Sequence, residues 1–160
     1  MVVTRVEVTP KQGEGMRDVR GDSARRQLLS DHGISASDVR SIVGFLIKSD
    51  ISGEDISSRS NDLFTDPIIE IGSTNILAMS NSEIFPTTPD CVITIGFKPG
   101  VTDNPGKAAL DGFYTIFPQA TDTEISTYIT YAFYGLPADC DSQWLAGTIH
   151  NGLIQRAIIS

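Results

Sequence analysis

The chain has 160 residues, a formal net charge of −8, and 40% hydrophobic and 20% charged residues. This apolar content excludes intrinsic disorder and predicts a packed core, in one ordinary domain or two very small ones. The sequence has no Lys/Arg cluster of the size that nucleic acid requires, no run apolar enough to cross a bilayer, and no signal-peptide layout. We therefore expect a cytoplasmic protein that binds neither nucleic acid nor membrane.

The sequence contains an internal repeat at an offset of 85 residues, from Asp18 to Asp103. This offset needs no gap between Asp18 and Ile71. Upstream, residues 11–13 match residues 98–100 if the first copy carries two extra residues. The other matched positions are Gly21 with Gly106, Leu28-Leu29 with Phe113-Tyr114, Ser41 with Ser126, and Ile69 with Ile154. Such repetition predicts two copies of one supersecondary unit that share a core.

The first half predicts the order strand, helix, strand, helix, strand. Residues 5–10 alternate as a strand does, and a Gly-rich turn leads to a helix over 22–32 that Gly33 ends. A long strand over 39–48 is apolar on both faces between residues 42 and 47. A weaker helix is expected after Ser52, its N-cap, and a last strand covers 67–71.

The second half predicts the same order. A strand over 91–97 is followed by a helix over 107–117, which Pro118 ends. Residues 125–134 alternate as a strand, with Tyr128 and Thr130 on the face opposite Ile129. A helix around Trp144 begins near Asp139 or Asp141, and a strand covers 153–159. In the helix over 107–117, one face carries Leu110, Phe113, Tyr114 and Phe117.

These elements predict an α+β fold made of two β-α-β-α-β modules related to the ferredoxin-like fold, at 1–71 and 91–160. Residues 72–90 are rich in Ser, Thr, Asn and Pro and form the expected linker, with a short pairing segment at 76–79. Each module alone would be marginally stable. We expect the two sheets to pack face to face about a pseudo-twofold axis, with Phe45 in the interface.

No residue set predicts catalysis, cofactor binding or metal binding. Cys91 and Cys140 are expected to be reduced, mostly buried thiols, and neither His32 nor His150 has a partner at a triad or metal spacing. Asp18 and Asp103 are expected to cap the helices that follow them. The glycines nearby are interpreted as turn residues rather than a phosphate loop, because Walker and dinucleotide spacings are lacking.

The most specific motif runs from a strand through a Gly-rich turn into a helix. Its residues are Lys98, Pro99, Gly100, Val101, Asp103 and Gly106, and its first-copy equivalents are Lys11, Gly13, Asp18 and Gly21. The first half also ends on Pro67-Ile68-Ile69-Glu70. This turn and ending resemble those of the PurS-type component of phosphoribosylformylglycinamidine synthase, also called formylglycinamide ribonucleotide amidotransferase. The resemblance covers nearly the whole chain except the linker.

In that family the PurS component is a separate subunit in some organisms and a duplicated N-terminal segment of one long synthetase in others. The duplication here favours the second arrangement. The resemblance implies a segment with no catalytic residues and no bound cofactor, which bridges glutaminase and synthetase domains or subunits in purine biosynthesis. The parent ligase aminates formylglycinamide ribonucleotide with glutamine, ATP and Mg. A regulatory module of the ACT or ferredoxin-like type, which senses a small molecule, is the alternative.

Overall fold

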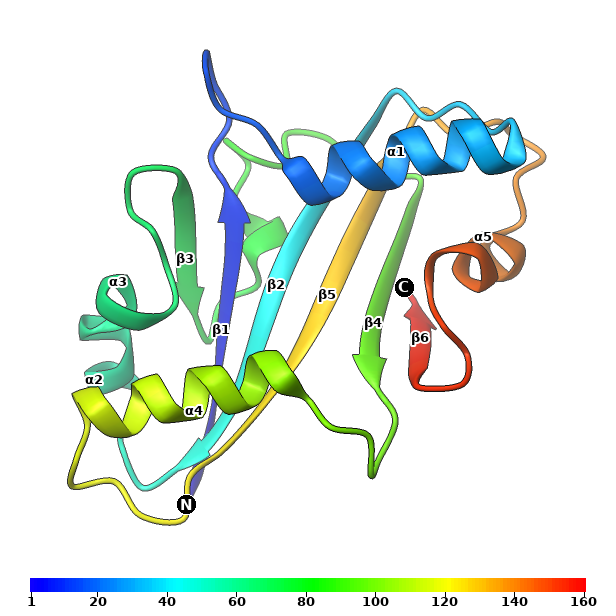
Figure 1. The fold of residues 1–160 in the computed structure, drawn as a ribbon. Coiled ribbons are helices and arrows are strands. Elements are labelled where there is room, and N and C mark those ends of the chain that lie inside the picture. Colours follow the sequence, from blue (N-terminus) through cyan, green and yellow to red (C-terminus); the bar gives the residue numbers. More distant parts are fainter.

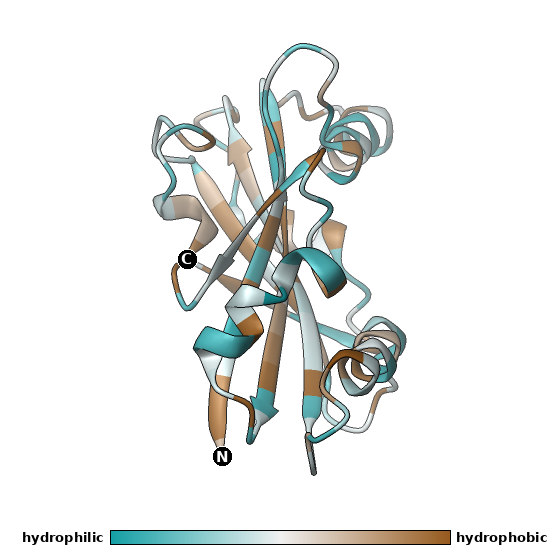
Figure 2. Cartoon of the chain, turned by 90° about the vertical axis from the view of Figure 1, so that its left-hand side faces the viewer, coloured by the Kyte–Doolittle hydropathy of each residue, from teal (hydrophilic) through white to brown (hydrophobic).

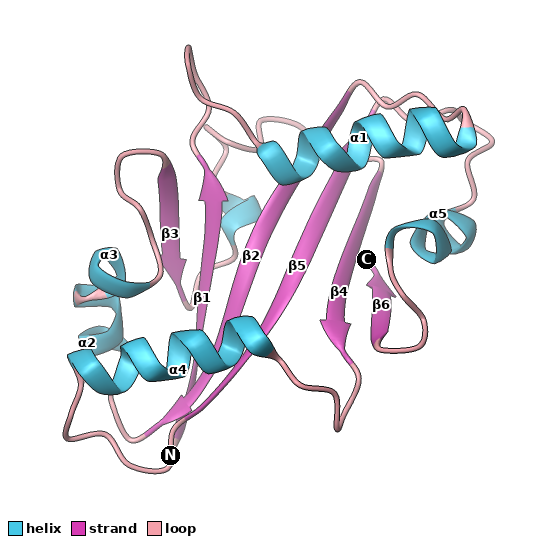
Figure 3. Cartoon of the chain, viewed as in Figure 1, coloured by secondary structure: helices cyan, strands magenta, loops and turns pink.

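The computed structural model describes residues 1–160 and contains one six-stranded antiparallel sheet with five α-helices (Figures 1 and 3). The strand order across the sheet is β3-β1-β2-β5-β4-β6. The strands are β1 (Val2–Pro10), β2 (Asp38–Ser49), β3 (Glu70–Thr74), β4 (Cys91–Phe97), β5 (Glu124–Tyr134) and β6 (Gln155–Ile159). The helices are α1 (Val19–His32), α2 (Gly53–Ser58), α3 (Ser60–Leu63), α4 (Asn104–Ile116) and α5 (Ser142–Ile149), with a 3₁₀ turn η1 (Ala78–Ser80). The mixed α+β class is therefore confirmed.

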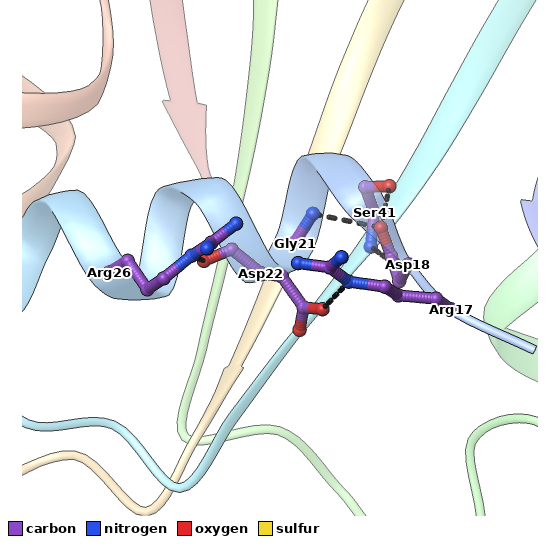
Figure 4. A network of polar contacts seen from close by, with 6 residues as sticks. All are labelled: Arg17, Asp18, Gly21, Asp22, Arg26 and Ser41. Atoms are coloured by element: carbon purple, nitrogen blue, oxygen red, sulfur yellow. Dashed lines mark hydrogen bonds and ion pairs between the residues drawn. The ribbon is translucent and has the colours of Figure 1, made fainter.

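Equivalent contacts fix the first helix of each half onto its sheet. Asp18 caps α1 by accepting from Gly21 N, and it also accepts from the backbone and hydroxyl of Ser41 (Figure 4). Asp103 caps α4 and accepts in the same way from Thr127. The expected capping is confirmed. The expected match of Ser41 with Ser126 is wrong by one residue, because the chain between cap and strand is one residue longer in the second half.

The two halves join edge to edge. Strands β2 and β5 pair in register from Asp38 with Tyr134 to Lys48 with Glu124. The expected face-to-face packing of two sheets is therefore wrong. Pairing two long strands satisfies the backbone groups of both edges at once, whereas stacked sheets would leave both edges open. The strand order is symmetric about this pair.

Helices α1 and α4 lie on the same side of the sheet, which we call the helix face (Figures 1 and 2). The first core cluster is centred on Phe113 of α4 and includes Val6, Ile47 and Phe117. The second is centred on Leu28 of α1 and includes Ile93, Phe133 and Leu145 of α5. Phe113 and Phe117 thus occupy the core as the spacing of apolar residues predicts. In Figure 2, hydrophobic residues recur along the strands.

The last strand of the first half begins later than its sequence predicts. Asp66 accepts a hydrogen bond from Ile68 N, and its backbone carbonyl accepts from Glu70 N. These bonds hold residues 66–70 in a turn, so β3 starts at Glu70 rather than at residue 67. The linker correspondingly starts after Thr74.

The linker crosses the opposite side of the sheet, which we call the open face. Ile84 and Phe85 of the linker are buried against Ile42 of β2 and Ala132 of β5. The pairing segment expected at 76–79 is wrong, because Ala78 and Met79 belong to the 3₁₀ turn η1 and Ala78 N donates to Glu7 of β1. The linker therefore covers Ile42 on the open face of β2, whereas Leu46 on the same face lines a groove.

Gly21 allows α1 to approach β2 closely. A Cβ at this position would lie 2.0 Å from the Val39 carbonyl oxygen. Gly21→Ala is expected to lower the unfolding free energy by about 1–3 kcal/mol, because the backbone of α1 must shift. The matched control is Gly147→Ala in α5, where an added Cβ meets no atom within 4 Å. This control is expected to stabilise the protein by about 0.5–1 kcal/mol in urea unfolding, and equal effects would contradict the close-approach argument.

Phe45 lies on the helix face, with its ring centroid 4.8 Å from that of Phe64, rather than between two sheets. Phe45→Asp is expected to lower the unfolding free energy by about 2–4 kcal/mol, because it places a charge among apolar side chains. Leu46→Asp is the control, since Leu46 points to the open face and lines a groove. Its expected cost is below about 1.5 kcal/mol in the same urea titration.

Candidate functional site

A groove of about 710 Å³ lies on the open face, and we call it the open-face groove. Its floor comes from strands of both halves, and one wall comes from the turn after β4. The lining includes Arg5, Glu7, Leu46, Thr94, Gly96, Lys98, Pro99, Gly100, Val101, Asp103, Tyr128, Thr130, Arg156 and Ile158. This volume is in the range of ligand and peptide sites. Because the lining comes from both halves, the groove exists only when β2 and β5 are paired.

The floor of the groove has a buried carboxylate that connects three segments. Glu7 is 5% exposed, and its side chain accepts from Tyr128 Oη at 2.5 Å and from Ala78 N at 2.8 Å. A Cβ on Gly44 would lie 2.0 Å from Cζ of Tyr128, so the tyrosine ring lies directly over this glycine. Gly44 therefore allows a tyrosine of the second half to reach a carboxylate of the first.

Burial raises the pKa of Tyr128 well above its usual range, and the hydrogen bond and charge of Glu7 raise it further. The phenol consequently stays protonated and donates to the carboxylate over the whole range in which proteins normally work. The pair is a fixed polar feature of the groove floor.

Next to this pair, the hydroxyls of Thr94 and Thr130 hydrogen-bond each other across β4 and β5 at 2.8 Å. At Gly96, also on β4, an added Cβ would meet no atom within 4 Å. The strand surface over Gly96 is therefore open space, bounded by Tyr128 on the neighbouring strand.

The rim of the groove is basic although the protein is acidic. Arg5, Lys98 and Arg156 are exposed and line the groove, and none of them forms an ion pair within the chain. Lys98 Nζ donates to the Gly152 carbonyl, which fixes its position at one end. These charges favour a ligand that carries negative charge.

The motif turn in the second half forms the wall of the groove. Lys98, Pro99, Gly100, Val101 and Asp103 all line it, whereas Gly106 is buried where α4 meets β5. Gly100 has a φ of 84°, and a Cβ on Gly106 would lie 2.6 Å from the Ile125 carbonyl oxygen. Asp103 joins α4 to Thr127. The motif therefore shapes the groove through its backbone, and its carboxylate is engaged in structural hydrogen bonds.

The equivalent residues of the first copy lie outside the groove. Lys11 Nζ donates to the Pro67 carbonyl at 2.6 Å, Gly13 has a φ of 136°, and Asp18 and Gly21 seat α1 on β2. The structure brings each turn next to its own sheet edge and keeps the two turns apart. Sequence reasoning missed Arg5, Glu7, Tyr128 and Arg156, and a glycine in the middle of β2 was the only signal of a close approach there.

The remaining reactive side chains lie outside the open-face groove. His32 packs edge-on against Trp144, with centroids 5.2 Å apart, and His150 Nδ1 contacts the Ala146 carbonyl. Cys91 is buried, and burial raises the pKa of the Cys140 thiol. No group of three or more His, Cys, Asp or Glu side chains is arranged to hold a metal ion.

No protein-family model matches the chain, and a search of curated proteins finds no significant match. None of the five helices combines the length and apolar character needed to span a membrane.

Tyr128→Phe removes the hydroxyl that satisfies Glu7 Oε2. At about pH 7 the variant is expected to lose about 1–3 kcal/mol of unfolding free energy. The folded wild type holds the Tyr128 proton more tightly than the unfolded chain does. Its contribution to stability is therefore present below the usual tyrosine pKa of about 10 and is lost as the pH rises further.

The difference between wild type and Tyr128→Phe should accordingly be constant up to about pH 9 and shrink as the pH rises above about 10 in urea unfolding. Tyr134→Phe is the control, since the Tyr134 hydroxyl reaches only the Thr87 carbonyl, at 3.3 Å, near the surface. A difference that is independent of pH would contradict the role given to the phenol proton.

Proposed function

We propose that the chain is a non-catalytic PurS-like domain of phosphoribosylformylglycinamidine synthase, which bridges the glutaminase and synthetase parts in the cytoplasm. The observation that carries this proposal is the Lys98–Gly106 turn, which resembles the turn of PurS. It stands in a chain whose halves share the order strand, helix, strand, helical segment, strand, with α2 and α3 in the first half where the second has α5. The parent reaction is the amination of formylglycinamide ribonucleotide with glutamine and ATP. In this view the pair of modules corresponds to a PurS dimer fused into one chain.

Equivalent side-chain contacts at both ends of the sheet support the proposal. Lys11 Nζ donates to the carbonyl of Pro67, and Lys98 Nζ donates to the carbonyl of Gly152. In each half the accepting residue lies two positions before an isoleucine, Ile69 or Ile154. The following side chains repeat as well, since Glu70 accepts from Asp66 N and Gln155 accepts from Asn151 N. These contacts involve the residues of the turn and of the ending on which the resemblance rests. They favour duplication over chance similarity.

The functional groups of the motif support a structural role for it. Lys98 binds a carbonyl, Asp103 caps α4, and the groove carboxylate of Glu7 is bonded to Tyr128 and Ala78. Groups engaged in this way are suited to holding a surface in shape rather than to moving protons. The chain therefore contributes a docking surface to an enzyme whose chemistry takes place on its partners.

A small-molecule-sensing module of the ACT or ferredoxin-like type is the second candidate. The observation that favours it is the open-face groove itself, whose 710 Å³ would accept an amino acid. The two candidates differ in their ligands, because a sensor is stabilised by a free metabolite and a bridging domain by a protein partner.

Co-expression tests the proposal. The chain should co-purify with a PurS-dependent synthetase subunit and its glutaminase, and it should restore glutamine-dependent activity to that pair when the pair's own PurS is left out. The control is Gly100→Val, which forces a β-branched residue into the left-handed backbone of the turn. This variant should fold and lose most of the stimulation, because the turn is displaced.

Failure of the wild-type chain to bind or to stimulate the synthetase would contradict the bridging role. A rise in Tm with a particular free amino acid, seen in a panel of all of them, would favour the sensor instead.

A further inference from the structure

The two ends of the open face along the β2–β5 pair are covered differently. At one end the linker covers the sheet, where Ile84 and Phe85 bury Ile42 and Ala132. At the other end the open-face groove runs past Leu46 and Tyr128, and the linker lines it only through Leu77 and Met79.

By the symmetry that relates the two halves, the open-face groove is equivalent to the linker seat, which is the surface that Ile84 and Phe85 of the linker cover. Val43 pairs with Ile129 at the centre of the β2–β5 ladder, and Ser41 and Thr127 make the same contacts in the two halves. The sequence offset from Ser41 to Thr127 also makes Ile42 equivalent to Tyr128, and Leu46 equivalent to Ala132. The surface under Ile84 and Phe85 therefore has its equivalent at Tyr128 and Leu46, on the groove floor.

The chemistry of the groove differs from that of the linker seat in its charge. Arg5 and Arg156 stand on its rim, exposed and without ion-pair partners, in a protein of net charge −8. Ile158 is 59% exposed beside Arg156, and the space over Gly96 is open. The groove thus combines a floor of mixed polarity, on which Leu46 and the ring of Tyr128 offer apolar surface, with a basic rim. This combination is complementary to an acidic chain with bulky apolar side chains.

We propose that the open-face groove binds an extended, acidic segment of a partner protein. Two adjacent bulky apolar side chains of that segment cover Tyr128 and Leu46, as Ile84 and Phe85 of the linker cover Ile42 and Ala132. Acidic side chains next to them pair with Arg5 and Arg156. The inference rests on the proposed function in one respect, namely that the chain works by binding other proteins.

The test is a selection of random peptides about 12 residues long, enough to span the sheet at roughly 3.3 Å per residue, against the whole chain. The selection should enrich peptides with one or more acidic residues beside two bulky apolar ones. A synthetic copy of an enriched peptide should shift the amide NMR signals of Leu46, Gly96 and Tyr128. The double variant Arg5→Glu/Arg156→Glu should bind it about tenfold or more weakly.

The matched control is Arg26→Glu/Lys107→Glu, which makes the same change in net charge at exposed positions on α1 and α4. It should change the affinity less than about twofold at physiological salt. Circular dichroism and urea unfolding should show that both double variants fold, because all four side chains are exposed.

Four results would overturn the inference. They are no enrichment, enrichment of peptides that shift amides outside the groove, displacement of the peptide by inorganic phosphate alone, and a concentration-dependent dimer that protects the groove. The last two would assign the groove to a small anion or to a second copy. A chain that binds the synthetase but selects no such peptide would keep the proposed function and lose this inference.

Discussion

The pairing of β2 with β5 is the interaction on which the rest of the structure depends. Each half alone would be a three-stranded sheet with one helix face, too small for an independent core and open at a long apolar edge. The shared ladder removes both edges and makes one sheet on which α1 and α4 can lie. It also places Tyr128 over Gly44, so the Glu7–Tyr128 bond of the groove exists only because the halves are joined this way.

Local signals in the sequence were sufficient for the elements and their caps. Asp18 and Asp103 cap α1 and α4, Gly33 ends α1 in a left-handed conformation, and Phe113 faces the core, all as predicted. The arrangement of the halves was not predictable in the same way. A strand that is apolar on both faces, as β2 is, can be covered by a second sheet or by a linker, and the sequence pattern is the same in both cases.

The sequence predicted only the part of the candidate site that comes from one short segment of the chain. The turn from Lys98 to Asp103 is a motif in the sequence and forms one wall of the groove. Arg5, Glu7, Tyr128 and Arg156 belong to three strands, β1, β5 and β6, and Glu7 is separated from Tyr128 by 121 positions. Their proximity follows from strand order and register, which no periodicity encodes. The one-residue longer connection before β5 decides which side chains face each other across the halves.

Divergence between the two halves gives the open face its asymmetry. Glu7 and Thr94 are at equivalent positions, since Glu7 pairs with Gly44 and Thr94 with Thr130. At this position the first half has the carboxylate of Glu7 and the second half has the hydroxyl of Thr94. Likewise, the second half has Tyr128, which lies over Gly44, where the first half has the aliphatic Ile42. Glu7 bonds both to Tyr128 on the groove floor and to Ala78 of the linker. The packing of the linker at one end of the open face therefore orients side chains that form the groove at the other end.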